Sequence, residues 1–273
     1  MSQAELPVAV EAKDLTIAYG RHVAVHRVSL SLAAGSLTAI VGPNGAGKSS
    51  LLSALAGRSR PAAGHILRPA GRPRLAYLPQ QSAIDRSFPV RVMDVVMLGH
   101  WSVLGAFGGA NAAMRRQALD ALATVGLHGF ENRLIGELSV GQFQRVLFAR
   151  LVLQDAAVIL LDEPFSGIDA RTTAELLALV HAWHGQARTV VAVLHDLDQV
   201  RAQFPQTLLL AREAIAFGDT ETVLSTENLL HARETAEHWD TPAGVNTSGA
   251  SGAAGFASPL DGERAPSFFK RAA

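Results

Sequence analysis

The N-terminal residues carry a pattern of apolar and polar positions that predicts short β-strands. Apolar side chains recur at nearly every second position over residues 8–20 and 26–35, which is typical of strands with one exposed face. Residues 36–42 are largely apolar without alternation, which favours a strand buried on both faces. We therefore predict an N-terminal antiparallel β-subdomain followed by the first strand of a central sheet.

From residue 48 onward the pattern alternates between helices and buried strands. Leu51, Leu52 and Leu55 lie at helical spacing, and Gly57 is expected to end that helix. Further helices are predicted over 142–154 and 172–185, and further strands over 74–79, 158–162 and 189–195. Because strand and helix alternate, the central sheet is expected to be mainly parallel, and the predicted fold class is α/β.

Two segments fall outside this alternation. Residues 90–135 have a mostly helical pattern with a glycine-rich break at 104–111, so we expect a helical subdomain of about residues 82–140 inserted between the strands. Residues 241–273 are rich in Gly, Ala and Ser and contain too few apolar residues to form a core, which predicts a disordered tail. One folded domain is thus expected over residues 8–235.

Composition narrows the possible functions mainly by exclusion. The 24 Lys and Arg residues balance the 24 Asp and Glu residues, so global charge gives no reason to expect nucleic acid as a partner. The absence of cysteine excludes disulfides, thiolate metal sites and thiol catalysis. No apolar run reaches the roughly 18–20 residues of a spanning helix, and the N-terminus does not resemble a signal peptide. A function at a membrane would therefore need a partner protein.

A glycine-rich loop carries the first chemical signal. Residues 42–49 match the pattern G-x-x-x-x-G-K-[ST] between a strand and a helix, the context that a phosphate-binding loop needs. Its glycines let backbone N–H groups and the positive end of the helix dipole point at phosphates. Lys48 would reach the β- and γ-phosphates, and the Ser49 hydroxyl would bind Mg²⁺. The candidate nucleotide-binding residues here are Gly42, Pro43, Asn44, Gly45, Ala46, Gly47, Lys48, Ser49 and Ser50.

Polar residues also follow two of the predicted buried strands. Asp162 and Glu163 come at the end of one strand, and His195 ends the next. Because parallel strands open their ligand crevice at the carboxyl edge, these residues are expected beside the phosphate loop. Asp162 would hold Mg²⁺, and Glu163 would polarise the attacking water as a catalytic residue. For His195 alone a capping or core role is as common as a catalytic one, but the neighbouring motifs favour catalysis.

These motifs, with four more, resemble those of the ATP-binding-cassette (ABC) ATPases. The run Leu138-Ser139-Val140-Gly141-Gln142 is similar to the LSGGQ signature of the family. Gln80 in YLPQ resembles the Q-loop glutamine, Asp169 in SGID the D-loop, and Tyr19 in IAYG the aromatic residue that stacks on adenine. The resemblance covers roughly residues 8–225, with the motifs in family order, and it implies the fold of a P-loop NTPase cassette.

The resemblance implies a nucleotide site that is completed by a second copy of the chain. Two copies would enclose two ATP molecules, each held by the phosphate loop of one chain and by residues 139–142 of the other. ATP and Mg²⁺ are the implied cofactors. The implied Mg²⁺ ligands are Ser49, Gln80 and Asp162. Gln80 and His195 would sense the γ-phosphate and Asp169 would contact the partner chain, so a monomer is expected to be catalytically idle.

Val140 departs from the family pattern, which usually has glycine at this position. A β-branched residue adds bulk and restricts φ and ψ. We therefore predict that this loop approaches the nucleotide somewhat differently. Activity is expected to be retained, because Ser139 and Gly141 remain.

The wider sequence is similar to the ATPases of zinc and manganese importers. The segments QQSAIDRSFPVRVMDVVMLGHW and DEPFSGIDARTTAELL carry this similarity. It implies a motor subunit that powers import of a divalent metal ion, with zinc favoured over manganese. This subunit is expected to be peripheral on the cytoplasmic face of the inner membrane. The implied partners are permease membrane subunits, a second copy of the chain and, indirectly, an extracytoplasmic metal-binding protein. A siderophore or haem importer, another ABC transporter and a soluble non-transport ABC ATPase are the alternatives.

Residues 87–101 are the expected docking surface for a permease. They come shortly after the Q-loop glutamine, and Val92, Val95 and Val96 have the spacing of an apolar helix face. Apolar spacing does not separate a face that binds a partner from one that packs in the core, so both roles are expected in part.

Overall fold

A computed structural model of the chain describes residues 7–68, 74–81, 84–101, 105 and 109–240. The tail that the sequence predicts to be disordered, residues 241–273, lies outside the described residues. The predicted domain boundaries stay predictions.

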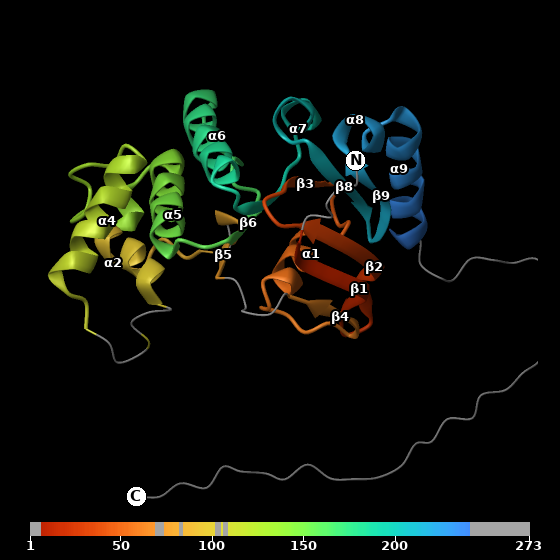
Figure 1. Cartoon of the computed structure of the whole chain (residues 1–273), viewed down its shortest axis with the longest axis horizontal. Helices are drawn as coiled ribbons and strands as arrows, with labels where there is room; N and C mark the ends of the chain where they lie inside the picture. Colours follow the sequence, from red (N-terminus) through yellow and green to blue (C-terminus); the bar gives the residue numbers. More distant parts are fainter. Residues whose placement is uncertain (1–6, 69–73, 82–83, 102–104, 106–108, 241–273) are drawn as a thin grey trace, which may run out of the picture. The chain divides into compact units, whose positions relative to one another are not determined.

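The N-terminal part forms a small antiparallel sheet (Figure 1) with the strand order β2-β1-β4. Its strands are β1 (Val8–Tyr19), β2 (His22–Ala33) and β4 (Ala63–Leu67). Strands β1 and β2 confirm the predicted antiparallel β-subdomain. The sequence did not indicate β4, because most of its residues are exposed and it has no apolar alternation.

The central sheet has the strand order β5-β6-β7-β3-β8-β9. Its strands are β3 (Leu37–Val41), β5 (Leu75–Leu78), β6 (Val158–Asp162), β7 (Thr189–Val193), β8 (Gln206–Ala211) and β9 (Glu213–Asp219). All neighbouring pairs are parallel except β8 and β9, which pair antiparallel. The mainly parallel α/β fold is therefore confirmed, although β8 and β9 were not predicted.

The central sheet separates two hydrophobic cores, which explains its unbroken apolar strands. In β7, Val190 and Ala192 belong to the core on one face, and Val191 and Val193 belong to the core on the other. The first core includes residues of helices α5 (Val140–Gln154) and α6 (Ala170–Gly185), and the second includes residues of helix α1 (Lys48–Leu55) and of the N-terminal sheet. Burial on both faces holds the strand ends, and the loops that follow them, in fixed positions.

A helical block packs against α5 (Figure 1). It contains α2 (Val92–Met97), the 3₁₀ turns η2 (Leu98–His100) and η3 (Ile135–Glu137), and α4 (Ala112–Thr124). The inserted helical subdomain is thus confirmed as part of the fold. Val92, Val95 and Val96 are buried in its core, which corrects the expectation that they also line a docking groove. Their spacing is that of a core face.

The chain continues past β7 with elements that the sequence did not predict. These are α7 (Leu197–Gln203), α8 (Thr220–Val223) and α9 (Thr226–Asp240), together with β8 and β9. Helix α9 packs against β8 and β9, so it belongs to the central fold.

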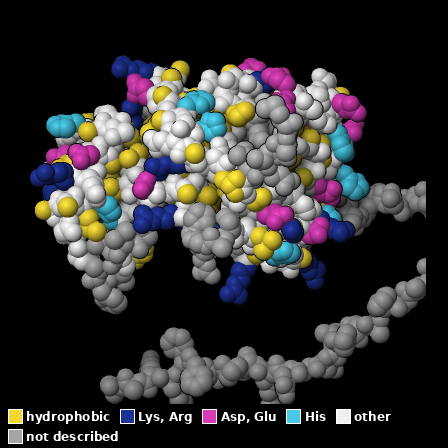
Figure 2. All heavy atoms as spheres, in the orientation of Figure 1, with side chains coloured by type: hydrophobic (Ala, Val, Ile, Leu, Met, Phe, Trp, Pro, Cys, Tyr) yellow, Lys and Arg dark blue, Asp and Glu magenta, His cyan; other side chains and the backbone are white. Residues whose placement is uncertain are grey.

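Charged side chains of both signs and histidines are interspersed on the face shown in Figure 2, as the balanced composition leads one to expect. None of the helices in the described part of the chain is long and apolar enough to cross a membrane.

Candidate functional site

The phosphate loop between β3 and α1 is held against both sheets through two glycines. A Cβ atom on Gly42, which has φ 150°, would lie 1.9 Å from the Leu210 carbonyl oxygen on β8. A Cβ atom on Gly47, with φ 87°, would lie 2.0 Å from the Ala24 carbonyl oxygen on β2. Only glycine fits these close approaches, so the loop takes its shape from the central sheet on one side and the N-terminal sheet on the other.

Lys48 is buried at the centre of this loop, with 6% of its surface exposed. Its Nζ donates hydrogen bonds of 2.8 Å to the carbonyl oxygens of Gly42 and Pro43. Burial lowers the pKa of Lys48, while the nearby charges of Glu163 and Asp162 act in the opposite direction. A cationic group is therefore held where the motif places the phosphates.

Asp162 ends β6 beside the start of α1. Its Oδ1 accepts a hydrogen bond of 2.9 Å from the Ser49 hydroxyl, and its Oδ2 accepts one of 3.4 Å from the Tyr77 hydroxyl. Burial raises the pKa of Asp162 above its usual value, with a further contribution from the charge of Glu163. Burial and the charge of Asp162 also raise the pKa of Tyr77 to about 12. A buried carboxylate beside a hydroxyl is a set of hard oxygen ligands that fits Mg²⁺.

Glu163 follows Asp162 in the sequence, and three polar side chains contact its carboxylate. His195 Nε2 lies 2.7 Å from Oε1, while Gln80 Nε2 at 2.9 Å and the Ser166 hydroxyl at 3.2 Å donate to Oε2. Burial alone would raise the pKa of Glu163, but the hydrogen bond and charge of His195, with the Ser166 bond, lower it below its usual value. The carboxylate is thus kept ionised.

The backbone at Glu163 is unusual for a residue with a side chain. Its φ of 49° lies in the left-handed region, which costs a non-glycine residue about 1–3 kcal/mol. A pocket of about 200 Å³ opens beside Glu163, between Ser166 and His195. The space next to an ionised carboxylate is where a water molecule could be polarised for attack.

The remaining predicted nucleotide residues lie on or near this loop. Asn44 and Gly45 are exposed, Ala46 is buried, and Ser50 lies half-buried on α1. Tyr19 ends β1 with 54% of its surface exposed, and it lies close enough to Tyr77 to raise the pKa of that residue. An exposed ring at this edge is available for stacking on a base.

The signature residues lie at the start of helix α5. Ser139 caps helix α5, because its hydroxyl accepts from the Gln142 N–H at 3.2 Å while Gln142 Oε1 accepts from the Ser139 N–H at 3.0 Å. Asp169 caps α6 by accepting from the Thr172 N–H at 2.9 Å. A Cβ atom on Gly141 would lie 3.7 Å from Asp169 Oδ2, so signature and D-loop are neighbours.

No hydrogen bond or ion pair between described residues joins the signature or Asp169 to the phosphate loop. The structure therefore brings together the phosphate loop, Gln80, Asp162, Glu163 and His195, and it leaves the signature and Asp169 outside that cluster.

Val140 is exposed at the start of α5. Its Cγ1 lies 3.7 Å from the position that a Cβ atom on Gly167 would take, and its carbonyl oxygen accepts from Gln81 Nε2 at 3.4 Å. The side chain that departs from the family pattern thus packs toward the D-loop of its own chain.

Sequence reasoning missed two polar residues that contact this site. Tyr77 contacts Asp162, and Gln144 is a buried amide on α5 that donates to the Pro164 carbonyl oxygen at 2.6 Å. Tyr77 is part of the YLPQ segment, of which only Gln80 was predicted to be a site residue. The second follows the signature by two positions, and nothing in its spacing distinguishes it from a core residue.

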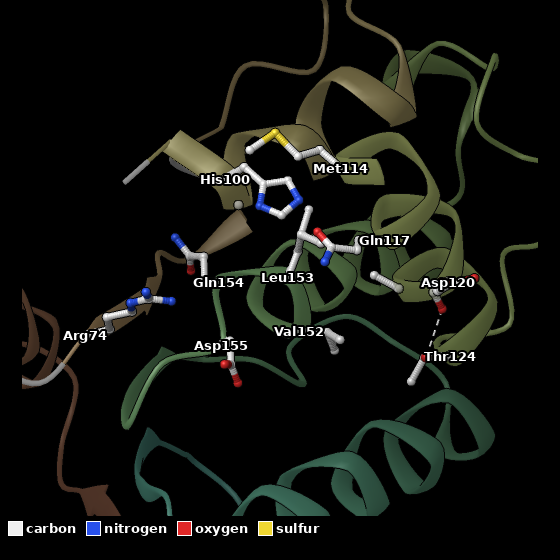
Figure 3. A pocket seen from close by; sticks show the side chains of 12 residues that line it. Arg74, His100, Met114, Gln117, Asp120, Thr124, Val152, Leu153, Gln154 and Asp155 are labelled. Atoms are coloured by element: carbon white, nitrogen blue, oxygen red, sulfur yellow. Dashed lines mark hydrogen bonds between the residues drawn. The ribbon is translucent and has the colours of Figure 1, made fainter. Parts of the chain in front are cut away.

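A larger pocket of about 510 Å³ lies in the helical block beside the end of α5 (Figure 3). His100, which is 8% exposed, and Gln154 come from different elements and line it. His100 Nε2 and Gln154 Oε1 are buried and have no hydrogen-bond partner among the described residues. Among the described residues, no group of three or more His, Asp or Glu residues is placed to hold a metal ion.

Comparison with known proteins gives consistent results. A family model described as "ABC transporter" matches residues 25–166. The manganese transport system ATP-binding protein MntB of Listeria monocytogenes is 41% identical over 228 residues, which are 82% of this chain and 95% of that protein. The zinc transport system ATP-binding protein TroB of Treponema pallidum is 40% identical over 82% of this chain and 86% of its own length.

The fold itself is shared with solved structures. A dimeric bacterial ABC transporter cassette superposes with a TM-score of 0.68 at 24% identity, covering 77% of this chain and 98% of that chain. At this identity the likeness shows the fold.

Proposed function

Because this chain belongs to the ATP-hydrolysing subunits of ABC transporters, we propose that it powers the import of a divalent metal ion, zinc or manganese, through a partner permease. The observation that carries the proposal is the assembly of Lys48, Asp162 and Glu163 at one sheet edge, in a chain about 40% identical to ATPases named for manganese and zinc transport. Both metals appear among these names, so they support the ion class without separating the two.

The proposed chemistry follows from the cluster around the phosphate loop. The loop N–H groups and Lys48 bind the phosphates of ATP, and Ser49 and Asp162, with Gln80, would hold the Mg²⁺ that neutralises their charge. Glu163, kept ionised by His195, accepts a hydrogen bond from the attacking water and so raises its nucleophilicity. His195 and Gln80 hold the carboxylate from two sides, which fixes its orientation toward the pocket beside it.

The proposed active form is a dimer of two copies. The signature and Asp169 make no bond to the phosphate loop of their own chain within the described residues, which supports a role for Ser139, Gly141 and the N-terminus of α5 in binding a ligand of another copy. A helix N-terminus with free N–H groups is suited to a phosphate. A head-to-tail pair would place each signature on the ATP of the other copy, and loss of the γ-phosphate would weaken the contact.

The permease is proposed to dock on the helical block at the cytoplasmic face of the membrane. We define the docking face as the exposed apolar side chains of Phe88, Leu98 and Trp101, the last 58% exposed, together with the pocket around His100. His100 and Gln154 present buried polar atoms to that pocket (Figure 3), and a permease segment would supply their hydrogen-bond partners. Apolar anchors around a polar pocket are typical of a specific protein interface.

The docking proposal is tested by co-purification with the permease from detergent-solubilised membranes. Leu98→Ser and Trp101→Ser are expected to lose the permease and to keep the ATPase activity of the free subunit. Leu230, an equally exposed leucine on α9, provides the matched control Leu230→Ser, which should retain the permease. Retention by both helical-block variants would refute this docking face.

The cargo is tested by growth of a deletion strain in media limited separately for zinc, manganese and iron. A defect relieved by zinc or by manganese, with uptake of the same radioactive metal lost, is the expected result. A defect confined to iron limitation would instead favour the alternative of a siderophore or haem importer. A chain that stays soluble when its permease is present would favour a non-transport ABC ATPase.

A further inference from the structure

Gln144 bridges two loops of the catalytic site through a buried side chain. It lies on α5, is 2% exposed, and its Nε2 donates to the Pro164 carbonyl oxygen at 2.6 Å. Its Oε1 accepts a hydrogen bond from Gln81 Nε2. Both ends of the amide are therefore occupied, as a buried polar group requires.

The orientation of the Gln144 amide is determined by the backbone carbonyl of Pro164. A carbonyl oxygen only accepts hydrogen bonds, so the NH₂ group of Gln144 must face Pro164 and its oxygen must face Gln81. The NH₂ group of Gln81 faces two acceptors, Gln144 Oε1 and the Val140 carbonyl oxygen. The direction of each bond in the relay Gln81–Gln144–Pro164 is thus fixed.

Each residue that the relay touches is the direct neighbour of a residue at the site. Gln81 follows Gln80, which donates to Glu163; Pro164 follows Glu163 itself. Val140 follows Ser139, which caps the signature helix. The amides of Gln81 and Gln144 together therefore connect the Q-loop, the start of the signature helix and the turn that carries the proposed base.

The connection matters because the backbone conformation of Glu163 is intrinsically unfavourable for a residue with a side chain. Its φ of 49° persists only where the surroundings fix it. The carbonyl of the next residue, Pro164, is held by Gln144, while the Glu163 side chain is held by Gln80 and His195. Backbone and side chain are thus restrained from two different loops.

We infer that Gln144 is a positioning residue for Glu163. Through Gln144, each signature helix sets the geometry of the base in its own chain, and this geometry depends on the nucleotide that the helix binds from the partner copy. The two ATP sites of a dimer are then coupled, because the signature serving one site is joined rigidly to the carboxylate of the other. This inference rests on the proposed roles of Glu163 and Ser139.

The test is steady-state ATP hydrolysis by Gln144→Met, which keeps the length of the side chain and removes both hydrogen bonds. We expect kcat to fall about 10- to 100-fold, the cost of a small misplacement of a reacting group, with KM for ATP changed less than about twofold. The Hill coefficient for ATP is expected to fall toward one. Gln203→Met, which removes a hydrogen bond to His181 and touches none of the side chains that contact Glu163, is the matched control and should change neither value.

A second variant keeps the inference testable if Gln144→Met does not fold. Gln81→Met removes the same link from the half-exposed side, and we expect it to lower kcat and the Hill coefficient in the same sense. The double variant should be no worse than Gln144→Met, because the two residues act through one relay. Folded variants with unchanged kcat overturn the positioning role, and an unchanged Hill coefficient overturns the coupling.

Failure of this inference can be told from failure of the proposed function by the Glu163→Gln variant. If that variant hydrolyses ATP normally, the assignment of the base is wrong whatever Gln144 does. If it is inactive while Gln144→Met and Gln81→Met hydrolyse ATP normally, only the relay is refuted.

Discussion

Nε2 of His195 lies 2.7 Å from Oε1 of Glu163, so the proposed base is held by a residue of the loop that follows the neighbouring strand, β7. This contact, with the hydrogen bond from Ser166, outweighs burial and lowers the pKa of Glu163 below its usual value. A carboxylate with a lowered pKa is ionised at all pH values above its normal range, and it loses its charge only as the pH falls through the lower folded value.

The pH dependence of hydrolysis should therefore respond to His195. In the His195→Ala variant the main lowering contribution is gone, so the pKa of Glu163 rises and the acid limb of the kcat/KM profile moves to higher pH. Rate profiles between the acid limb and neutrality, measured for both proteins, check this. An acid limb in the same place would mean that Glu163 is not the group that titrates. His181→Ala, outside the cluster, is the control.

Replacing the carboxylate separates binding from hydrolysis. Glu163→Gln keeps the shape of the side chain and removes its basicity, so kcat is expected to fall about 10²- to 10⁴-fold with ATP binding retained. The variant should accumulate as an ATP-bound dimer on size-exclusion chromatography. Glu234→Gln, an exposed substitution on α9, should behave as the parent protein. Normal turnover in Glu163→Gln would remove this residue from the catalytic role.

Lys48 should decide nucleotide affinity. A charge-assisted hydrogen bond contributes about 1.5–3 kcal/mol, so Lys48→Ala is expected to weaken ATP binding by at least about tenfold. Binding of a fluorescent ATP analogue measures the change. Lys13, whose ammonium pairs with Glu11 on the N-terminal sheet, provides the control Lys13→Ala. Equal affinities for the two variants would contradict the assignment.

Two glycines of the phosphate loop should differ sharply in their tolerance of a methyl group. At Gly45 no atom of the described residues lies within 4 Å of an added Cβ, so Gly45→Ala adds only the strain of φ 77°, about 1 kcal/mol. At Gly42 the added Cβ meets a backbone oxygen at 1.9 Å, so Gly42→Ala should lower the free energy of unfolding by at least about 3 kcal/mol. Urea denaturation of both variants gives the comparison, and equal losses would refute the close approach.

Val140→Gly tests the departure from the family signature. The valine side chain lies next to Gly167 of its own chain, so removing it should loosen the start of α5 and alter KM or kcat for ATP by about two- to fivefold. Steady-state kinetics against Val8→Gly, at an exposed valine of the N-terminal sheet, would provide the comparison. If ATP affinity and turnover stay as they are, this valine has no part in nucleotide handling.

The sequence predicted the parts of the fold that have strong local patterns. Strands β3, β6 and β7 are buried on both faces and read as apolar runs, and α5 and α6 have clear helical spacing. Strand β9 lies at an edge with only partial burial, and α9 carries a mostly polar sequence, so neither shows a period that distinguishes it from a loop. Both are stabilised by packing on β8, a tertiary contact that local pattern does not contain.

The candidate site was predictable where strand ends determine position. Asp162 ends the buried parallel strand β6 and His195 follows the buried parallel strand β7, which places both residues at one edge of the sheet. Gln144 was not predictable, because its partners Gln81 and Pro164 come from loops whose approach depends on the packing of α5. The valines of α2 were assigned in part to a partner surface because spacing alone does not tell a partner from a core.

The clamping of the phosphate loop between the two sheets links nucleotide binding to the cohesion of the whole cassette. Gly42 lies against β8 and Gly47 lies against β2, so the loop keeps its shape only while the two sheets remain packed against each other. By thermodynamic linkage, a nucleotide bound there must in turn hold the sheets together. Hydrogen exchange at the seam between β2 and β9, which touch each other, should slow when ATP binds, making the seam a remote reporter of occupancy.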